Sequence, residues 1–285
     1  MASKKPQITL FTPGNRRDFI EKAKRFEPDG IIIDFEDAVP IALKVKVREE
    51  IGALIPTLGQ TVLVRVNNEP DYLEDDLKAI VSRHLYGIML PMAESAENVR
   101  NADNIIARLE RERGLEPNSI RIFASLETAM GCFRCFEVAT AAKRIEAVTF
   151  GSAEDGDLQR TLKCAWSAEG TEMLYARSKV LLEGRAAGLP MVLDGAFSDV
   201  ENDDDLRTDC TLSKRLGYDG RTVIHPRHVA IARAIYSPSA AEIDHYTRMV
   251  AAFEAAEKQG LAAIAWEGKL VDYAMYKKAM AFIAD

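Results

Sequence analysis

Residues 30–37 of the chain read GIIIDFED, an uninterrupted apolar run that leads into a group of acidic side chains. An apolar run without alternating polar residues is typical of a parallel strand whose two faces are both covered. The acidic side chains would then stand at the carboxyl end of that strand. The stretch therefore predicts a buried strand of an α/β protein that ends at a polar site.

The same cycle of a short apolar run and a longer amphipathic stretch recurs about every 25 to 30 residues, the length of a βα unit. The strand-like runs cover residues 8–12, 30–35, 61–66, 87–91, 120–126, 147–151, 191–195 and 221–225. Helical patterns lie between them, for example at 73–83, 96–113, 170–187 and 203–216. Eight such units favour a TIM (β/α)8 barrel over an open doubly wound sheet, which usually has fewer strands.

The pattern changes after the eighth unit, which predicts a barrel domain over residues 1–236 and a C-terminal helical extension over 237–285. Ser239 and Glu242 have the spacing of a capping box, so a helix should begin there. A second helix is expected to begin near Lys269. The extension would either pack on its own barrel or reach into a neighbouring subunit.

Composition excludes several classes of protein. The chain has 285 residues with 37 Lys and Arg against 44 Asp and Glu, so its net charge of −7 argues against nucleic-acid binding. The longest apolar runs are strand-sized and no signal-peptide pattern is visible, so we expect no membrane partner. Four cysteines are too few for a disulfide scaffold, which favours the cytoplasm, and the CFRC stretch at 132–135 is interpreted as buried helical thiols.

Polar side chains follow several of the predicted strands, where the active site of a TIM barrel lies. Glu36 and Asp37 follow the second strand, Arg65 ends the third, and Glu127 and Asp155 follow the fifth and sixth. Carboxylates bind a hard cation such as Mg²⁺, and an Arg side chain binds a carboxylate or an enolate through paired hydrogen bonds. A single acid beside a strand is usually a helix cap, but several at one barrel mouth predict a magnesium site.

These residues belong to a longer series of motifs that resembles the citrate lyase β-subunit-like family. The motifs occur in the family's order: LFTPGNR at 10–16, DFEDAV at 34–39 with Lys44 and Arg48, RVN at 65–67, LP at 90–91 with ES at 94–95, LETA at 126–129, GSAED at 151–155, IHP at 224–226, YSPS at 236–239 and GKLVD at 268–272. The resemblance covers nearly the whole chain. It implies a Mg²⁺-dependent TIM barrel, usually homotrimeric or hexameric, similar to malyl-CoA, citramalyl-CoA and citryl-CoA lyases.

The resemblance also assigns roles to individual residues. Glu127 and Asp155 match the metal ligands, and Glu127 would also contact the substrate. Arg65 would bind and polarise the oxo acid or the developing enolate. Asp272 matches an acid/base residue in the family's C-terminal segment, which reaches into the active site of a neighbouring subunit.

Further matches are less direct. Glu36 and Asp37 would organise water around the metal and assist catalysis. The positions at which the family contacts its substrate or CoA correspond to Phe11, Arg16, Lys22 and Lys44. One departure concerns Met92, because the family commonly has Lys after the Leu-Pro of the fourth strand.

The resemblance and the acidic mouth together predict a carbon–carbon lyase that acts on a 3-hydroxyacyl-CoA thioester. Such a cleavage produces an enolate, which a cation and an Arg side chain would stabilise. Two alternatives remain open, since a fold does not fix a function. One is a pyruvate-type metal-dependent aldolase acting on free hydroxy-oxo acids, and the other is a non-catalytic subunit that binds an acyl thioester. Asp272 in its GKLVD context favours the thioester lyase, whereas Met92 favours a changed or lost activity.

Overall fold

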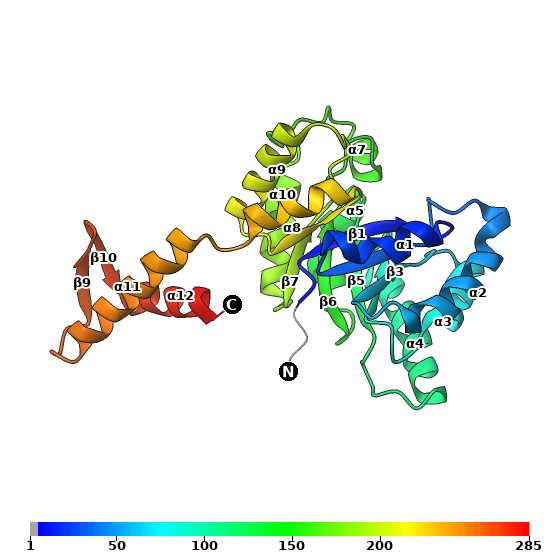
Figure 1. The fold of residues 1–285 in the computed structure, drawn as a ribbon, viewed down its shortest axis with the longest axis horizontal. Coiled ribbons are helices and arrows are strands. Elements are labelled where there is room, and N and C mark those ends of the chain that lie inside the picture. Colours follow the sequence, from blue (N-terminus) through cyan, green and yellow to red (C-terminus); the bar gives the residue numbers. More distant parts are fainter. Residues whose placement is uncertain (1–4, 285) are drawn as a thin grey trace. The chain divides into compact units, whose positions relative to one another are not determined.

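Eight parallel strands close into a barrel in the order of the sequence, in a computed structural model that describes residues 5–284 (Figure 1). The strands are β1 Ile8–Pro13, β2 Gly30–Asp34, β3 Val62–Arg65, β4 Gly87–Leu90, β5 Arg121–Leu126, β6 Ile145–Phe150, β7 Met191–Asp194 and β8 Gly220–Val223. Pairing of β1 with β8, in which Thr9 lies opposite Thr222, closes the barrel. The predicted TIM barrel is confirmed, and each predicted strand overlaps an observed one.

Helices surround the barrel and follow its strands (Figure 1). They are α1 Arg17–Ala23, α2 Lys44–Leu54, α3 Pro70–Ile80, α4 Ala96–Glu112, α5 Ala129–Phe133, α6 Cys135–Ala139, α7 Asp157–Leu162, α8 Leu174–Ala186, α9 Asp203–Leu216 and α10 Pro226–Tyr236, with short 3-10 helices at Lys24–Phe26, Ile41–Leu43 and Ile55–Thr57. Local sequence explains several boundaries. Ser95 caps α4 in a capping box with Asn98, and α9 ends at Gly217, whose φ of 113° suits a glycine.

The alternation of side chains along each strand divides the apolar residues between two clusters. Ile31 and Ile33 point outward and join the large core beneath the helices, whereas Ile32 points into the barrel. Leu63 and Phe123 belong to the same interior cluster as Ile32. Two residues further along these strands, the inward positions reach the barrel mouth and are polar, so the strand period itself positions the candidate site.

A buried network of charges joins β7 and β8 to the helices outside them. Arg177 of α8 lies 2.8 Å from Asp194 and 2.6 Å from Asp209, and Arg221 lies 2.8 Å from Asp209. Arg221 also donates to the carbonyl of Gly195 at 2.6 Å. All four charged residues are buried. Each charge therefore depends on its partners, since an unpaired buried charge is costly.

We expect Asp209→Asn to lower the free energy of unfolding by about 3–5 kcal/mol, because it leaves Arg177 and Arg221 short of negative charge. Urea denaturation measures this loss. The matched control is Asp204→Asn on the exposed side of the same helix, which should cost no more than about 1 kcal/mol. Equal effects of the two substitutions would contradict the role given to the network.

The chain divides into two compact units, Met1–Tyr236 and Ser237–Asp285. The second unit contains α11 Ala240–Glu257, β9 Ala263–Trp266, β10 Lys269–Asp272 and α12 Tyr273–Ala284. Ser239 and Glu242 form the predicted capping box at the start of α11. The small core of this unit consists of Met249, Phe253, Val271 and Ala279.

The helix expected near Lys269 is wrong, because β10 occupies residues Lys269–Asp272 and pairs antiparallel with β9. Glu267 and Gly268 join the two strands, with φ angles of 45° and 77°. Two consecutive residues with positive φ are typical of the tight turn of a two-residue hairpin. The final helix begins only at Tyr273, after Asp272, whose carboxylate accepts the N–H groups of Ala274 and Met275 at 2.9 and 3.3 Å.

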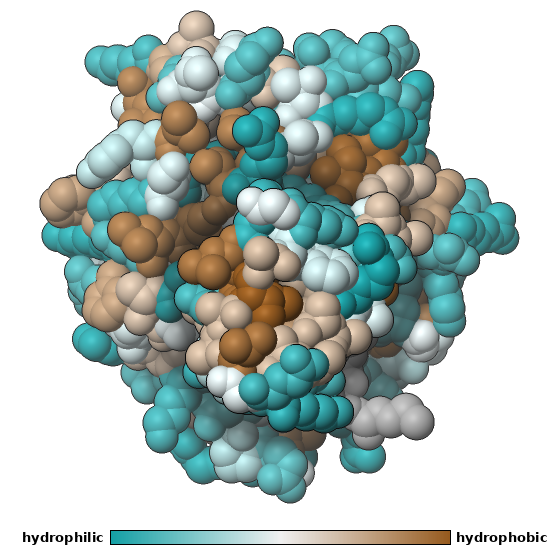
Figure 2. All heavy atoms as spheres, turned by 90° about the vertical axis from the view of Figure 1, so that its left-hand side faces the viewer, coloured by the Kyte–Doolittle hydropathy of each residue, from teal (hydrophilic) through white to brown (hydrophobic). Residues whose placement is uncertain are grey.

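The second unit also exposes many large hydrophobic side chains. Figure 2 shows hydrophobic surface between hydrophilic side chains on one face of the molecule. The exposed hydrophobic residues of the second unit are Ile243, Leu261, Leu270, Tyr273, Met275, Met280 and Ile283. Such surface is typical of an interaction site.

The structure agrees with the interpretation of Cys132 and Cys135 as buried helical thiols. Cys132 and Cys135 are buried on α5 and α6, and all four cysteines of the chain are free. Burial raises the pKa of the Cys132 thiol to about 12, which makes it unreactive at neutral pH. None of the helices between residues 5 and 284 combines the length and apolar character that a bilayer crossing needs.

Candidate functional site

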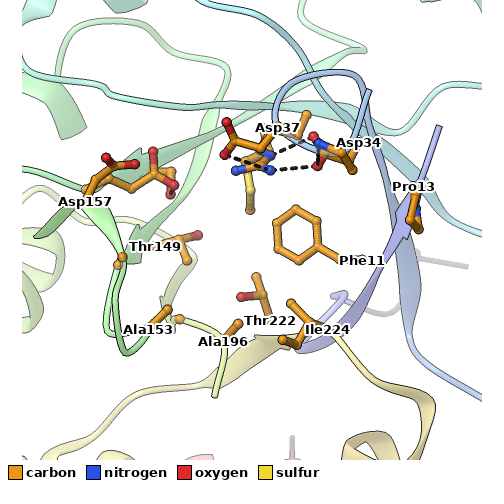
Figure 3. A pocket seen from close by; sticks show the side chains of 18 of the residues that line it. Phe11, Pro13, Asp34, Asp37, Thr149, Ala153, Asp157, Ala196, Thr222 and Ile224 are labelled. Atoms are coloured by element: carbon orange, nitrogen blue, oxygen red, sulfur yellow. Dashed lines mark hydrogen bonds and ion pairs between the residues drawn. The ribbon is translucent and has the colours of Figure 1, made fainter. Parts of the chain in front are cut away.

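A cavity of about 350 Å³ opens at the carboxyl ends of the barrel strands. One side of it carries Asp34 of β2 and Asp37 of the loop after β2 (Figure 3), and Arg65 of β3, which pairs with both, also lines the cavity. Glu127 and Asp157, which follow β5 and β6, also line it, and Asp157 stands on the side opposite Asp34 (Figure 3). Strand ends that are distant in sequence thus bring four carboxylates and one guanidinium to a single pocket.

Arg65 is held by three acidic side chains. Its Nε and Nη2 donate to the two carboxylate oxygens of Asp34 at 2.8 and 2.6 Å, and its Nη1 lies 2.8 Å from Glu36. Asp37 is 3.4 Å from Nη2, and the ring of Phe11 stacks at 5.2 Å from the guanidinium carbon. Burial opposes the charged form, but Asp34 and Glu36 outweigh it and raise the pKa of Arg65. The guanidinium is therefore charged and fixed at the barrel mouth.

Asp34 also shapes the loop that follows β2. Its carboxylate accepts the backbone N–H groups of Glu36 at 2.9 Å and Ala38 at 3.2 Å. On the other side of this loop, the buried ammonium of Lys44 donates to the carbonyls of Phe35 and Glu36 at 2.8 and 3.1 Å, and to the side chain of Asn67. Lys44, a predicted substrate contact, thus supports the loop and does not line the pocket.

Glu127 is oriented by two uncharged donors. The hydroxyl of Ser125 donates to one carboxylate oxygen at 2.9 Å, and the backbone N–H of Met92 donates to the other at 3.0 Å. Met92 presents this N–H from a left-handed backbone conformation with a φ of 49°. Within residues 5–284, neither a lysine nor an arginine forms an ion pair with Glu127. Burial raises the pKa of Glu127, Arg65 opposes this, and Asp157 adds to it.

Glu36, which pairs with Arg65, has a strongly perturbed carboxyl group. Burial raises its pKa to about 8 in spite of Arg65, and the neighbouring carboxylates of Glu127, Asp37 and Asp34 add to the shift. Glu36 itself is not part of the pocket lining, but four carboxylates line the pocket against one guanidinium, so the negative charge there exceeds what Arg65 neutralises. A bound cation would relieve this excess.

The pKa of Glu36 predicts how the stability of the metal-free protein depends on pH. Between pH 4.5 and about 8 this group is protonated in the folded protein and ionised in the unfolded chain, so raising the pH favours unfolding. We expect the free energy of unfolding to fall by about 2 kcal/mol between pH 6 and pH 8 because of Glu36. Urea titrations in the presence of a chelator measure it. If Glu36→Gln shows the same fall, another group is responsible.

The structure does not place every predicted site residue at the pocket. Asp155 is exposed and is not part of the lining. Arg16 and Lys22 lie on the exposed surface around α1, at 3.1 and 3.9 Å from Asp18. Asp272 belongs to the second unit, where its carboxylate caps α12. The functional roles of these four residues remain predictions.

Ser125 and Asp157 were not among the residues selected from the sequence, and Asp34 was included only as part of the acidic stretch at 34–37. Ser125 occupies an inward position of β5, so the alternation from Glu127 was a usable signal. Asp157 carries no such signal, because it follows an irregular loop. Only the path of that loop brings it to the pocket.

The donor set fits a magnesium ion. Among the described residues, no three His, Cys, Asp or Glu side chains converge as a ready metal cage. Mg²⁺ needs no such cage, because it keeps several waters and uses one or two carboxylates together with oxygens of its substrate. Glu127, which accepts hydrogen bonds from Ser125 and Met92 and has no ion pair in the described part of the chain, is suited to be one of them.

Comparisons with known proteins find one matching family, relatives of similar sequence and solved structures of similar fold. Residues 7–226 match the family described as HpcH/HpaI aldolase/citrate lyase. Citrate lyase subunit beta of Escherichia coli (strain K12) is 32% identical over 267 residues, covering 92% of this chain and 87% of that protein. A (3S)-malyl-CoA thioesterase of Cereibacter sphaeroides (strain ATCC 17029 / ATH 2.4.9) is 33% identical over 271 residues, with coverages of 92% and 88%. The structure of CitE from Mycobacterium tuberculosis in complex with magnesium, acetoacetate and coenzyme A has a TM-score of 0.77 at 26% identity, covering 99% of this chain and 98% of that chain.

Proposed function

Because the chain belongs to the HpcH/HpaI aldolase/citrate lyase family, we propose that it is a Mg²⁺-dependent carbon–carbon lyase. Its substrate would be a 3-hydroxyacyl-CoA thioester such as citryl-CoA, citramalyl-CoA or malyl-CoA, which it cleaves to, or forms from, acetyl-CoA and a 2-oxo acid. The observation that carries this proposal is a pocket that Glu127, which forms no ion pair within residues 5–284, lines together with Arg65 and the carboxylates of Asp34 and Asp37. The CitE structure with bound magnesium and coenzyme A supports it.

The charge of each pocket residue suggests its role: the carboxylates would bind the cation, and the guanidinium would bind the substrate. Glu127, with a second carboxylate from the loop of residues 151–157, would hold the cation. A bound magnesium ion would polarise the oxygen of the nascent 2-oxo acid and stabilise developing negative charge. Arg65 would bind the carboxylate of the oxo acid or the enolate through its paired N–H donors. Glu36 and Asp37 would keep Arg65 oriented and order water in the pocket.

The second unit would complete the site in an assembly of several subunits. Its exposed hydrophobic side chains suit burial against another subunit. We propose a homotrimer or a hexamer, the assemblies that the resemblance to the citrate lyase β-subunit-like family implies. Asp272 would then enter a neighbouring pocket and deliver a proton to the enolate carbon. Residues 237–285 would thus connect assembly with catalysis.

Subunit mixing tests the role of Asp272. Asp272→Asn keeps a side-chain carbonyl that caps α12, so the variant should fold, while its carboxyl group is lost. We expect Asp272→Asn and Arg65→Ala to be inactive alone. Mixed in equal amounts, they should regain about one quarter of wild-type activity, because random assembly pairs an intact barrel with an intact Asp272 in half times half of the sites.

Two controls make this result decisive. Exchange of differently tagged subunits must be verified by native mass spectrometry, and each variant incubated alone must stay inactive. No recovery in spite of verified exchange would refute the contribution in trans. Wild-type activity of Asp272→Asn alone would exclude the residue from catalysis.

A substrate panel tests the function itself. The protein with Mg²⁺ is incubated separately with malyl-CoA, citramalyl-CoA and citryl-CoA, and released 2-oxo acid is followed. Carbon–carbon cleavage yields a 2-oxo acid and leaves the acetyl thioester intact. Hydrolysis, which the name of the Cereibacter sphaeroides relative makes the second candidate, would instead yield a free thiol and the hydroxy acid.

Other outcomes separate the remaining alternatives. Cleavage of free hydroxy-oxo acids without any thioester turnover would identify a pyruvate-type aldolase. Binding of acyl-CoA without turnover of any of these compounds would identify a non-catalytic acyl-thioester-binding subunit. Either result would refute the proposed lyase activity.

A further inference from the structure

We propose that the hydroxyl group of Thr149 donates a hydrogen bond to the 2-oxo acid in the pocket and thereby contributes to the affinity for that acid. This inference rests on the proposed function, in which a 2-oxo acid is a substrate or a product. Thr149 lies just before the GSAED motif at 151–155. Its position, its burial and its lack of a partner carry the inference.

Thr149 occupies an inward position of β6 at the level of the barrel mouth. Along this strand, Ala147 belongs to the interior cluster, whereas Val148 and Phe150 belong to the core beneath the helices. The side chain of Thr149 therefore points inward, two residues closer to the mouth than Ala147. It lines the cavity, and Figure 3 shows it directed into the pocket.

The hydroxyl group of Thr149 has no hydrogen-bond partner among the residues that the structure describes, although Thr149 is only 3% exposed. Two other hydroxyl groups of the pocket lining have partners. Ser125 donates to Glu127 at 2.9 Å, and Thr12 donates to the carbonyl of Ile32 at 3.3 Å. A buried hydroxyl group without a partner is costly, and at the wall of a pocket it indicates a position where a ligand completes the hydrogen bond.

Thr149 lies beside the residues to which the proposed function gives the metal ion and the substrate. β5 and β6 pair in a register that sets Ser125 opposite Thr149, and Ser125 orients Glu127. Gly151 approaches Glu127 so closely that a Cβ atom there would lie 3.1 Å from the Glu127 Cγ. Arg65 lines the same cavity. A small ligand held between Glu127 and Arg65 would therefore be within reach of the Thr149 hydroxyl group.

The chemistry of the pocket favours donation by this hydroxyl group. Four carboxylates line the cavity, from Asp34, Asp37, Glu127 and Asp157, and an ionised carboxylate only accepts hydrogen bonds. A 2-oxo acid such as pyruvate likewise offers only acceptors, at its carboxylate and its carbonyl oxygen. Thr149 provides a donor without adding charge, which complements such a ligand.

Thr149→Val tests the role of the hydroxyl group, because Val keeps the branched shape of the side chain and lacks the donor. Isothermal titration calorimetry of the full-length protein with pyruvate in the presence of Mg²⁺ measures the affinity. Loss of a hydrogen bond to a charged group corresponds to about 10- to 100-fold in affinity, so we expect Thr149→Val to bind pyruvate at least about 10-fold more weakly. Thr149→Ser keeps the hydroxyl group and should bind within about threefold of wild type.

Thr9→Val is the matched control. Thr9 lies on β1, two residues deeper in the barrel than Phe11, and is 1% exposed. Its hydroxyl group also forms no hydrogen bond within residues 5–284, but Thr9 is not part of the pocket lining. Removal of an unpartnered buried hydroxyl group should leave the melting temperature unchanged or raise it in both Val variants. Only Thr149→Val should lose affinity for pyruvate.

The possible failures are distinguishable. If Thr149→Val binds pyruvate within about twofold of wild type, or if Thr149→Ser loses as much affinity as Thr149→Val, the inference is refuted while the proposed lyase stands. A melting temperature of Thr149→Val well below that of Thr9→Val would assign the hydroxyl group a structural role and would also refute it. Wild-type protein that binds no pyruvate at millimolar concentration refutes the inference, and if it also releases no 2-oxo acid from the thioester panel, the proposed function is refuted as well.

Discussion

Glu127→Gln is expected to lower the turnover of a thioester substrate by at least about 10³-fold. A bound cation stabilises the charge of the transition state by several kcal/mol, and the loss of this stabilisation corresponds to that factor. The side chain of Gln keeps the size of Glu127 and an oxygen that accepts the N–H of Met92 or the hydroxyl of Ser125. What it loses is the charge that would hold the cation. Steady-state kinetics at saturating Mg²⁺ and substrate measure the effect.

The stability of this variant separates a functional role from a structural one. Burial raises the pKa of Glu127 in the metal-free protein, so the ionised carboxylate is unfavourable there and its removal relieves repulsion. The melting temperature without metal should therefore equal or exceed that of the wild type. Glu116→Gln, the same change at an exposed position, should leave turnover and stability unchanged. Turnover within about tenfold of wild type in Glu127→Gln would contradict the proposed role.

Arg65→Lys is expected to lower kcat by about 10²- to 10³-fold, the usual effect of removing a hydrogen-bond donor to a developing oxyanion. Lys keeps the positive charge but loses the planar pair of donors that contacts Asp34 and would contact the substrate. Because these paired hydrogen bonds also hold the loop after β2, we expect a loss of about 1–2 kcal/mol in the free energy of unfolding.

The control for this substitution is Arg121→Lys at the other end of the barrel, where Arg121 pairs with Glu146 at 2.8 Å. It should lose a comparable amount of stability or less and retain full turnover. Binding of pyruvate, followed by calorimetry in the presence of Mg²⁺, adds a readout that a structural role would not change. Arg65→Lys with unchanged kcat and unchanged pyruvate affinity would exclude Arg65 from substrate binding.

The sequence predicted the barrel well because the barrel depends on local patterns. Continuous apolar runs such as residues 30–35 are buried on both faces, inside the barrel and beneath the helices, and this burial requires no information about partners. The same pattern placed Arg65 and Glu127 at the mouth, because they stand at the carboxyl ends of predicted strands, where the active site of a TIM barrel lies. For these residues the fold and the site follow from one signal.

The second unit shows where local patterns were insufficient. Residues 263–272 contain no long strand, and the apolar character of the final segment suggested a helix from Lys269. A hairpin formed because Glu267 and Gly268 adopt a tight turn and Val271 packs with Met249 and Phe253 of α11. The packing of β10 against a helix about twenty residues away decides its conformation, and a single sequence contains no direct record of that contact.

By itself the sequence thus determined the eight-stranded barrel, its acidic mouth and the family of the chain. The tertiary structure alone decided which side chains of the same type face the pocket. The ammonium of Lys44 donates to carbonyls of the loop after β2 and does not reach the pocket. Asp155 stands in a β-turn outside the pocket lining, whereas Asp157 lines the cavity. The physical reason is that a regular strand fixes side-chain direction by its period, whereas in a loop the direction depends on turns and contacts that only the folded chain provides.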